Sequence, residues 1–258
     1  MKKRILSTLL MAIIGIPILL KGEIYFNILI TIIGILGVRE INKLIGKEKI
    51  VVLDIIRYLS IAFLINIHFL NISVVNYSLL VFLLYTFFSI FYISKKKLKI
   101  EDSVLSIFLT FLVGFSLMNI NFLREDRLAP LIFLLSLAII SDTFSYIIGS
   151  LIGKHKLTNI SPKKTWEGLL GGIISSIIIN TSFYHAALNN NLNIFLVILL
   201  VLFLTLIGQV GDLFFSSIKR GYKVKDYSEL IPGHGGVLDR IDSLTFIILG
   251  YMLILGFM

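Results

Sequence analysis

Residues that bind phosphates and metal ions are concentrated near the carboxyl end of the sequence. The densest segment, residues 216–243, reads SSIKRGYKVKDYSELIPGHGGVLDRIDS and lies between two apolar stretches. Carboxylate oxygens bind hard cations such as Mg²⁺, while lysine and arginine side chains bind phosphate oxygens. The sequence has no cysteine, which excludes disulfides, thiolate metal sites and a cysteine nucleophile. The segment therefore predicts chemistry on a phosphate group, with oxygen ligands for any metal.

Three aspartates in or before this segment are candidate ligands for two metal ions. Asp239 and Asp242 lie three residues apart, on one face if the stretch is helical, and Asp212 precedes them in LIGQVGDLFF. Gly208 and Gly211 beside Asp212 would let another backbone or a ligand approach closely. Nucleotidyl transfer needs metal ions at the attacked phosphorus and cations that hold the phosphate oxygens. The candidate cations are Lys219, Arg220 and Arg240.

A glycine-rich turn surrounds His234. Gly233, Gly235 and Gly236 supply the backbone freedom for a tight turn whose amides can face phosphate oxygens. The Walker spacing GxxxxGK[ST] is absent, and the four histidines are too scattered to indicate a catalytic triad. His234 is a candidate general base, ligand or structural donor, and these three roles stay open.

A second basic segment, residues 157–168, reads LTNISPKKTWEG and is a candidate anion clamp. We expect Ser161 to cap a helix that begins at Pro162, because exposed amides at a helix start bind phosphate. The alternative is an ordinary positively charged loop in which Trp166 anchors the chain at the membrane interface. The candidate substrate-binding residues of this segment are Lys163, Lys164, Thr165 and Trp166.

Carboxylates also occur within the apolar stretches of the carboxyl-terminal half. Asp142 follows an uninterrupted apolar run and precedes Thr143, Ser145 and Tyr146. A carboxylate inside a membrane helix costs about 3 kcal/mol, so it is usually paired, hydrated or bound to a cation. Asp142 is either a structural hydrogen-bond acceptor between helices or a supporting residue of the site. The earlier apolar stretches are almost free of such residues, which places the chemistry in the second half.

The chain that must position these residues is largely apolar. Hydrophobic residues make up 57% of its 258 residues, and about 20 apolar residues suffice for a helix to span a bilayer. Nine stretches qualify, near residues 5–20, 24–38, 55–72, 75–94, 103–121, 129–150, 167–187, 192–215 and 243–258. We predict an all-α, polytopic integral membrane protein with about nine transmembrane helices. We expect one integral domain over residues 1–258, with five helices in 1–128 and a catalytic half in 129–258.

Lysine and arginine residues fall almost entirely on one side of the predicted spans. Of the 24, only Lys21, Arg124 and Arg127 lie outside the amino-terminal tail and the even-numbered loops. By the positive-inside rule, the amino terminus and the catalytic loops are cytoplasmic and the carboxyl terminus is outside. This distribution explains the formal charge of +9 without nucleic acid binding. Residues 1–22 also have the character of a signal peptide, but without a small-residue cleavage site we expect a retained helix.

The dense segment resembles the signature of the phosphatidate cytidylyltransferases, also called CDP-diacylglycerol synthases. That signature runs S, x, an apolar residue, K, R, four residues, K, D, and later HGGxxDRxD. Its positions are occupied here by Ser216, Ile218, Lys219, Arg220, Lys225, Asp226, Ser228, Ile231, Pro232, His234, Gly235, Gly236, Val237, Asp239, Arg240, Ile241 and Asp242. The segments SPKKTWEG and SDTFSYIIG are similar to family segments too, so the resemblance covers about residues 142–243. The first five helices match only in hydropathy.

This resemblance implies an enzyme of phospholipid biosynthesis in the cell (inner) membrane. Phosphatidic acid would attack the α-phosphorus of CTP, giving CDP-diacylglycerol and pyrophosphate, with Mg²⁺ in a paired-metal centre held by Asp212 and Asp239. A homodimer is implied as well. With the residue chemistry, it assigns catalytic roles to Asp212, Asp239, Lys219, Arg220 and His234. Substrate-binding residues would be Lys163, Lys164, Thr165, Trp166, Ser216, Ser217, Lys225, Gly235, Gly236 and Arg240, with Asp142, Glu167, Asp226 and Asp242 in support.

Two other kinds of function stay open. Membrane kinases of polyprenols or phytol also bind CTP but would transfer its γ-phosphoryl group, and CDP-archaeol synthesis would use an ether lipid. A cation-coupled transporter, with Asp142 and Asp212 as ion ligands, is the alternative from another class. Broken helices and internal repeats would favour a transporter, whereas acids that adjoin a basic loop favour an enzyme.

Overall fold

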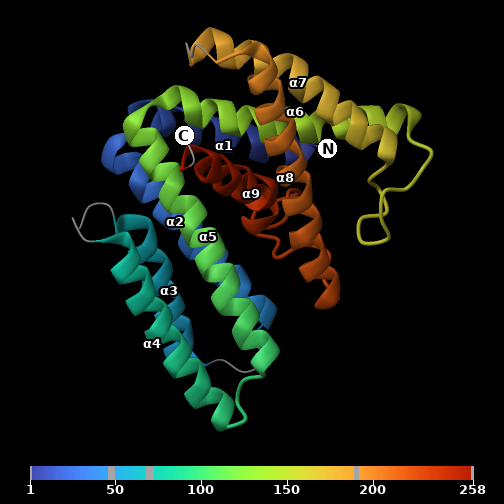
Figure 1. Ribbon diagram of the computed structural model, residues 1–258. Helices are drawn as coiled ribbons and strands as arrows, with labels where there is room; N and C mark the ends of the chain where they lie inside the picture. Colours follow the sequence, from blue (N-terminus) through green and yellow to red (C-terminus); the bar gives the residue numbers. More distant parts are fainter. Residues whose placement is uncertain (1, 46–49, 68–72, 189–191, 257–258) are drawn as a thin grey trace. The chain divides into compact units, whose positions relative to one another are not determined.

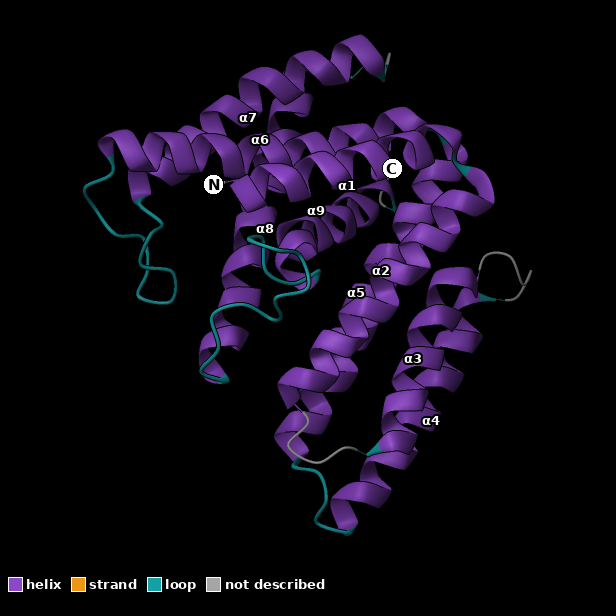
Figure 2. Ribbon diagram, turned by 180° about the vertical axis from the view of Figure 1, so that it is seen from behind, coloured by secondary structure: helices purple, strands orange, loops and turns teal. Residues whose placement is uncertain are grey.

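A computed structural model describes residues 2–45, 50–67, 73–188 and 192–256 of the chain. This part folds into nine α-helices without a β-strand, which confirms the predicted all-α class (Figures 1 and 2). The helices are α1 Lys2–Lys21, α2 Glu23–Ile45, α3 Val51–Asn66, α4 Val74–Ser94, α5 Ile100–Asp126, α6 Leu128–Ile152, α7 Trp166–Ala187, α8 Ile194–Gly221 and α9 Leu238–Leu255. Lys47, Lys49, His68 and the ends of two predicted stretches, at 68–72 and 257–258, lie outside the described residues.

Six of the described helices are long and apolar enough to cross a membrane: α2, α4, α5, α6, α7 and α8. Only helices and closed barrels span bilayers, because every backbone N–H and C=O in lipid must be satisfied within the protein. The predicted count of about nine spans is therefore approximate, since α1, α3 and α9 fall short by length or composition. The protein is a helical membrane protein, as its hydropathy predicts.

Helix boundaries differ from the predicted stretches where polar residues extend a helix. Helix α8 continues to Gly221 and so includes Lys219 and Arg220 in its last turn. Helix α9 begins at Leu238, five residues before the apolar stretch, and so includes Asp239 and Asp242. Basic residues are favourable in a last turn and acidic residues in a first turn, because of the helix dipole. The catalytic candidates thus sit on helix ends.

The chain forms two compact units. The first comprises Met1–Glu125 and Asp226–Arg240, and the second comprises Asp126–Lys225 and Ile241–Met258. Helix α9 begins in the first unit and continues in the second. The segment with the glycine turn therefore belongs with the amino-terminal helices, although it follows α8 in the sequence. The single integral domain stays a prediction.

In the first unit, α2, α3 and α5 pack through glycines. A Cβ at Gly34 of α2 would lie 2.5 Å from Ile65 of α3, and one at Gly114 of α5 would lie 2.8 Å from Leu64. Small residues let helix backbones approach closely in membranes, where dispersion contacts replace the hydrophobic effect.

At the end of α1, Arg124 of α5 donates to the carbonyls of Leu19 and Leu20, at 2.7 and 2.8 Å. These carbonyls belong to the last turn, which lacks partners within the helix.

In the second unit, α6, α7 and α8 pack side by side, and α9 packs against α8. On α7, a Cβ at Gly168 would lie 2.6 Å from the carbonyl oxygen of Ser145 in α6. On α8, a Cβ at Gly211 would lie 2.8 Å from the Phe246 ring and 2.9 Å from the carbonyl oxygen of Asp242. The expectation that Gly211 admits another backbone is thus confirmed, and that backbone is the start of α9. The contact places Asp242 beside the helix turn that carries Asp212.

Candidate functional site

A cluster of acids in the second unit is organised around Lys164 and Gln209. The Lys164 ammonium lies 2.5 Å from Asp212 Oδ2 and donates to Gln209 Oε1 at 2.8 Å. Gln209 in turn donates to Asp142 Oδ1 at 3.2 Å, and Ser243 Oγ donates to Asp142 Oδ2 at 3.3 Å. The structure thus brings together the SPKKTWEG loop, α6, α8 and α9. These contacts make Asp142 a hydrogen-bond acceptor between helices, and its supporting role in the site stays a prediction.

Asp242 adds a third carboxylate to this cluster. The negative charges of Asp212 and Asp142 repel the Asp242 carboxylate, whereas the positive charge of Lys219 attracts it. Ser216 Oγ donates to Asp212 Oδ1 at 3.2 Å, one helical turn away. The side chains of Lys164 and Asp212 are 21% and 22% exposed, so a ligand can reach the pair from the protein surface. Three carboxylates in mutual range favour the binding of further cations.

The oxygen chemistry of the cluster suits a hard cation, although the described residues do not form a complete metal site by themselves. Among the residues that the structure describes, no three His, Asp or Glu side chains converge as metal ligands. Asp212 nevertheless already holds a cation, the Lys164 ammonium, at contact distance. Mg²⁺ usually takes only one or two protein carboxylates, with water and phosphate oxygens as its other ligands. Asp212 and its acidic neighbours therefore fit the group, with room left for phosphates.

Asp239 lies in the first unit and holds the signature turn together. Its Oδ2 accepts hydrogen bonds from the backbone N–H groups of Tyr227 and Gly236, both at 2.9 Å. Gly235 has a φ of +86°, and a Cβ there would lie 2.9 Å from the same oxygen. Glycine is therefore needed for both conformation and space. The pairing of Asp239 with Asp212 as metal ligands joins the two units and stays a prediction.

Glu40 of α2 is a residue that the sequence analysis missed. It is 3% exposed and accepts hydrogen bonds from Ser228 Oγ at 2.6 Å, Val237 N at 2.7 Å and Leu238 N at 2.8 Å. The N–H groups of Val237 and Leu238 lie at the start of α9, where they have no acceptor within the helix. Glu40 therefore caps α9 from α2. The signal was a glutamate just beyond an apolar stretch, but nothing in the sequence connects it with residues almost 200 positions away.

His234 and Arg240 stabilise the conformation of the glycine turn. Arg240 donates through Nε and Nη2 to the carbonyl oxygen of His234, at 3.0 and 2.6 Å. Ser7 of α1 lies 2.8 Å from His234 Nδ1 and donates to the carbonyl oxygen of Pro232 at 3.1 Å. Because a hydroxyl has one hydrogen, this arrangement fits a histidine that donates from Nδ1. Of the three roles considered for His234, the contacts favour the structural donor.

The helix start predicted in the SPKKTWEG loop is wrong. Helix α7 begins at Trp166, and its N-cap is Thr165, whose Oγ1 accepts from Gly168 N at 3.1 Å. The backbone carbonyl oxygen of Ser161 instead accepts from Lys164 N–H in a turn, at 3.0 Å, and the loop folds back so that Lys156 pairs with Thr165. Thr165 therefore shapes the loop, while Lys163 and Trp166 are exposed.

The other candidates lie around these groups. Arg220 is exposed and donates to the carbonyls of Ile160 at 3.3 Å and Val224 at 3.0 Å, so it ties the end of α8 to the SPKKTWEG loop. Lys219 is 8% exposed. Glu167 lies 2.6 Å from His155 Nδ1. Ser217 donates to the carbonyl oxygen of Phe214 at 2.7 Å, while Lys225 and Asp226 are exposed at the junction of the units.

Comparisons with known proteins cover nearly the whole chain. A family model described as "Cytidylyltransferase family" matches residues 2–258. Proteins named "Phosphatidate cytidylyltransferase" from Staphylococcus epidermidis and Staphylococcus haemolyticus are each 32% identical to this chain. One of the same name from Staphylococcus aureus is 30% identical. Each of these matches covers 96% of this chain and 96% of the relative, so the similarity extends beyond the signature to the amino-terminal helices.

Proposed function

Because the chain belongs to the cytidylyltransferase family, we propose that it transfers CMP from CTP to phosphatidic acid, giving CDP-diacylglycerol and pyrophosphate. The observation that carries this proposal is the acid and lysine cluster of Asp212, Asp142, Asp242 and Lys164. Asp142 belongs to the SDTFSYIIG segment, Asp242 is the last residue of the signature, and Asp212 precedes the signature by one helical turn. Similarity to proteins named for this activity over 96% of the chain supports the same substrates.

In the proposed reaction, a phosphate oxygen of phosphatidic acid attacks the α-phosphorus of CTP. The bond between that phosphorus and the oxygen that bridges to the β-phosphorus breaks, and pyrophosphate leaves with the bonding electrons. Both substrates are polyanions, so the chain must neutralise charge and hold the reacting atoms in line. Lys164 contacts the acid cluster and the charge of Lys219 acts on Asp242. These two cations, with Lys163 and Arg220 beside them in the sequence, would hold these phosphates.

Asp212 and its neighbours would hold Mg²⁺, and when bound the metal supplies Lewis acidity toward the phosphate oxygens. Lys164 has a double role in this scheme. In the structure it neutralises Asp212, and a phosphate oxygen can accept from the same ammonium when Asp212 has another cation. Gln209 keeps Lys164 and Asp142 in place, because it bonds to both. Asp239 would complete the metal site from the start of α9.

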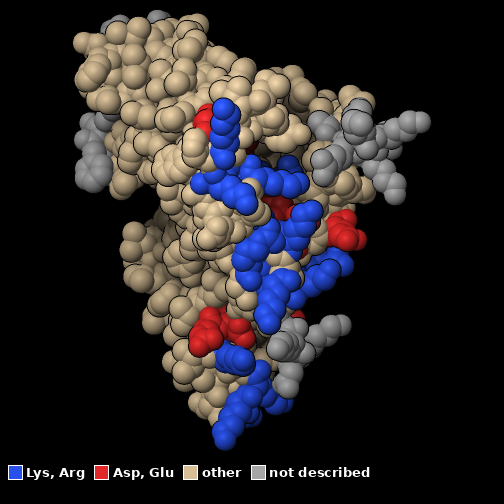
Figure 3. Space-filling model, turned by 90° about the vertical axis from the view of Figure 1, so that its right-hand side faces the viewer, with Lys and Arg blue, Asp and Glu red and all other residues tan. Residues whose placement is uncertain are grey.

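We propose that the amino terminus and the catalytic loops are cytoplasmic, that the carboxyl terminus is outside, and that the enzyme is a homodimer. The first part is supported by the distribution of lysine and arginine, which gather in the amino-terminal tail and the even-numbered loops. Figure 3 shows many lysine and arginine side chains, with fewer acidic side chains among them, on the face in view. Soluble CTP and the lipid headgroup can meet on that side of the bilayer.

The experiment that tests the reaction follows each phosphate of CTP separately. Purified protein in detergent micelles receives phosphatidic acid, Mg²⁺ and CTP labelled either at the α- or at the γ-phosphate. We expect the α-label in the lipid fraction and the γ-label in pyrophosphate. A γ-label in the lipid would identify a CTP-dependent kinase instead. Ion flux in proteoliposomes without turnover of CTP would favour the transporter.

A further inference from the structure

A cavity of about 640 Å³ lies in the first unit, formed by the end of α2, the start of α3 and the turn from α4 to α5. This volume is in the range of cavities that bind small ligands. Its charged lining contains two carboxylates, Asp54 and Asp102, and three times as many cations. The cations are Arg39, Lys43, Arg57, Lys96, Lys97 and Lys99.

Five of these cations form an exposed rim: Arg39, Lys43, Lys96, Lys97 and Lys99. Among the residues that the structure describes, none of the five forms an ion pair. Like charges that surround one hollow repel each other, and a bound anion relieves that repulsion. Membrane topology requires lysines in a cytoplasmic loop but does not require that they surround a cavity.

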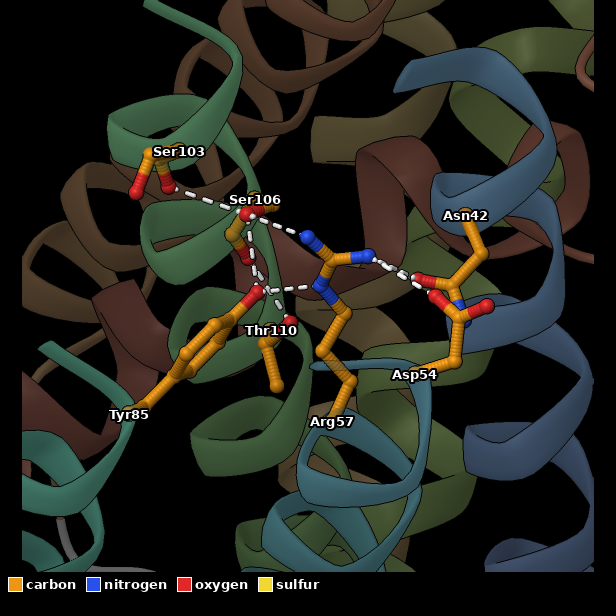
Figure 4. Close-up of polar contacts among 7 residues, drawn as sticks. All are labelled: Asn42, Asp54, Arg57, Tyr85, Ser103, Ser106 and Thr110. Carbon is orange, nitrogen blue, oxygen red and sulfur yellow. Dashed lines mark hydrogen bonds and ion pairs between the residues drawn. The ribbon is translucent and has the colours of Figure 1, made fainter. Parts of the chain in front are cut away.

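The floor of the cavity contains Arg57, which is 4% exposed and lies within α3. Its guanidinium contacts side chains from α2, α3, α4 and α5 (Figure 4). Nη1 donates to Asn42 Oδ1 of α2 at 2.8 Å and to Asp54 Oδ1 at 3.1 Å. Nη2 donates to Ser106 Oγ of α5 at 3.3 Å, and Nε donates to the Tyr85 hydroxyl of α4. A buried arginine is expensive in a membrane protein and usually marks a function.

The donors on this floor exceed its acceptors. A guanidinium has five N–H groups, and the four contacts above leave one Nη2 hydrogen without an acceptor in the part of the chain that the structure describes. The Nδ2 amide group of Asn42 is buried and has no hydrogen-bond partner among the described residues. A buried donor without an acceptor is unfavourable, so such groups normally have a hydrogen-bond partner in the functional state. An anion with several oxygen acceptors would provide one.

The rim is built at a conformational cost. Lys96 has a φ of +56°, in the left-handed region that glycine or asparagine usually occupies after a helix. Its N–H donates to the carbonyl oxygen of Ile93 at 2.8 Å, and Lys97 N–H donates to that of Tyr92 at 3.1 Å, which ends α4. A lysine is less favourable than glycine at this position, because its Cβ crowds the following carbonyl oxygen. The sequence nevertheless places a cation there, at the edge of the cavity.

The remaining lining is apolar: Ile45, Ile50, Tyr58 and Leu98. A free phosphate has no apolar atoms that could contact this wall, whereas a lipid has carbon atoms next to its phosphate. Anionic phospholipids are also the anions that lie at headgroup depth, where basic residues near helix ends attract them. The combination of cations, unpaired donors and apolar wall therefore fits an amphiphile better than a soluble anion.

We propose that this cavity is a binding site for the phosphate of an anionic glycerophospholipid, with Arg57 and Asn42 on its floor and the five rim cations around it. All of its residues belong to the first unit, and the binding does not require turnover. The shared chemistry of possible ligands is a phosphate ester, which a lipid or a soluble phosphate compound could supply. The headgroup of a lipid is the source that the apolar wall favours.

The test measures equilibrium binding of labelled dioleoylphosphatidylglycerol to the full chain in dodecylmaltoside micelles. This lipid is a phosphodiester, so it is not the phosphomonoester substrate of the proposed reaction. Lys97→Glu reverses a rim charge, and Lys95→Glu is the matched control, because Lys95 is in the same turn but contacts the Phe91 ring outside the cavity lining. We expect Lys97→Glu to raise the dissociation constant about tenfold, the loss of one charge-assisted contact, and Lys95→Glu to change it less than twofold.

A second variant, Asn42→Asp, tests the floor without disturbing Arg57. Aspartate keeps an oxygen that accepts from Arg57, but it replaces the unpaired amide with a negative charge. We expect weaker binding of phosphatidylglycerol with an unchanged helix content by circular dichroism. Equal losses in Lys97→Glu and Lys95→Glu would overturn the proposal, since they would indicate a general attraction to the loop. Equally tight binding of phosphatidylcholine would overturn it as well, and so would displacement of the lipid by millimolar glycerol 3-phosphate, which would identify a soluble ligand.

Discussion

Replacing Glu40 by glutamine removes the charge that caps α9 and organises the glycine turn. Its carboxylate accepts from Ser228 Oγ, Val237 N and Leu238 N at 2.6 to 2.8 Å, in a place where it is 3% exposed. A glutamine has one oxygen to offer, so at least one of these donors faces an NH₂ group instead. We expect Glu40→Gln to loosen residues 226–240, including Asp239, without unfolding the helices.

The magnitude follows from the three contacts. Hydrogen bonds to a charged group contribute about 1.5 to 3 kcal/mol each, and a buried donor that loses its acceptor costs about 1 to 3 kcal/mol. One lost bond and a weakening of the other two correspond to about 3 kcal/mol. If turnover requires the ordered turn, kcat falls about 100-fold, because each 1.4 kcal/mol is a factor of ten.

The assay combines CMP transfer in detergent micelles with hydrogen exchange at residues 226–240. Glu23→Gln is the matched control, since Glu23 belongs to the same helix but is exposed at its first turn. We expect the control to keep the wild-type kcat and exchange rates. A Glu40→Gln enzyme with kcat within twofold of wild type and unchanged exchange would refute the assignment of Glu40 as the residue that positions the turn.

Four further predictions concern the site and its supports. Asp212→Asn and Asp239→Asn should each lower kcat at least 100-fold while the thermal unfolding curve stays within a few degrees, and wild-type rates in either would rule out the proposed metal ligands. Removal of divalent cations with EDTA should abolish turnover, and added Mg²⁺ should restore it; activity that persists would exclude the metal. Gly235→Ala should lower kcat, because its φ of +86° and the 2.9 Å approach to Asp239 leave no place for a methyl group, and circular dichroism should show normal helix content. Gly211→Ala should destabilise the fold by about 1 to 3 kcal/mol in denaturant titrations, since its Cβ would meet Phe246 and Asp242, whereas Gly221→Ala, which meets nothing within 4 Å, should not.

The sequence by itself determined the class of the protein and the chemistry of its site. Long apolar runs dictate membrane helices, because backbone hydrogen bonds must close within the segment in lipid. The residue types of the signature, with lysines, arginines and aspartates in one segment, indicate phosphate chemistry without knowledge of any contact. Local signals of this kind can be read from neighbouring residues alone. They also identified Asp142 as a carboxylate that needs a partner.

Only the tertiary structure decided which distant residues act together. Lys164 meets Asp212 across 48 positions, and Glu40 caps a helix that begins nearly 200 positions later. These pairs depend on which segments pack against one another, and packing of this kind leaves no periodic trace in the sequence. The same holds for the start of α7, where Thr165, which pairs with Lys156, is the N-cap in place of the predicted Ser161. Hydropathy decides that a helix forms, whereas close packing of its small residues decides what its polar groups touch.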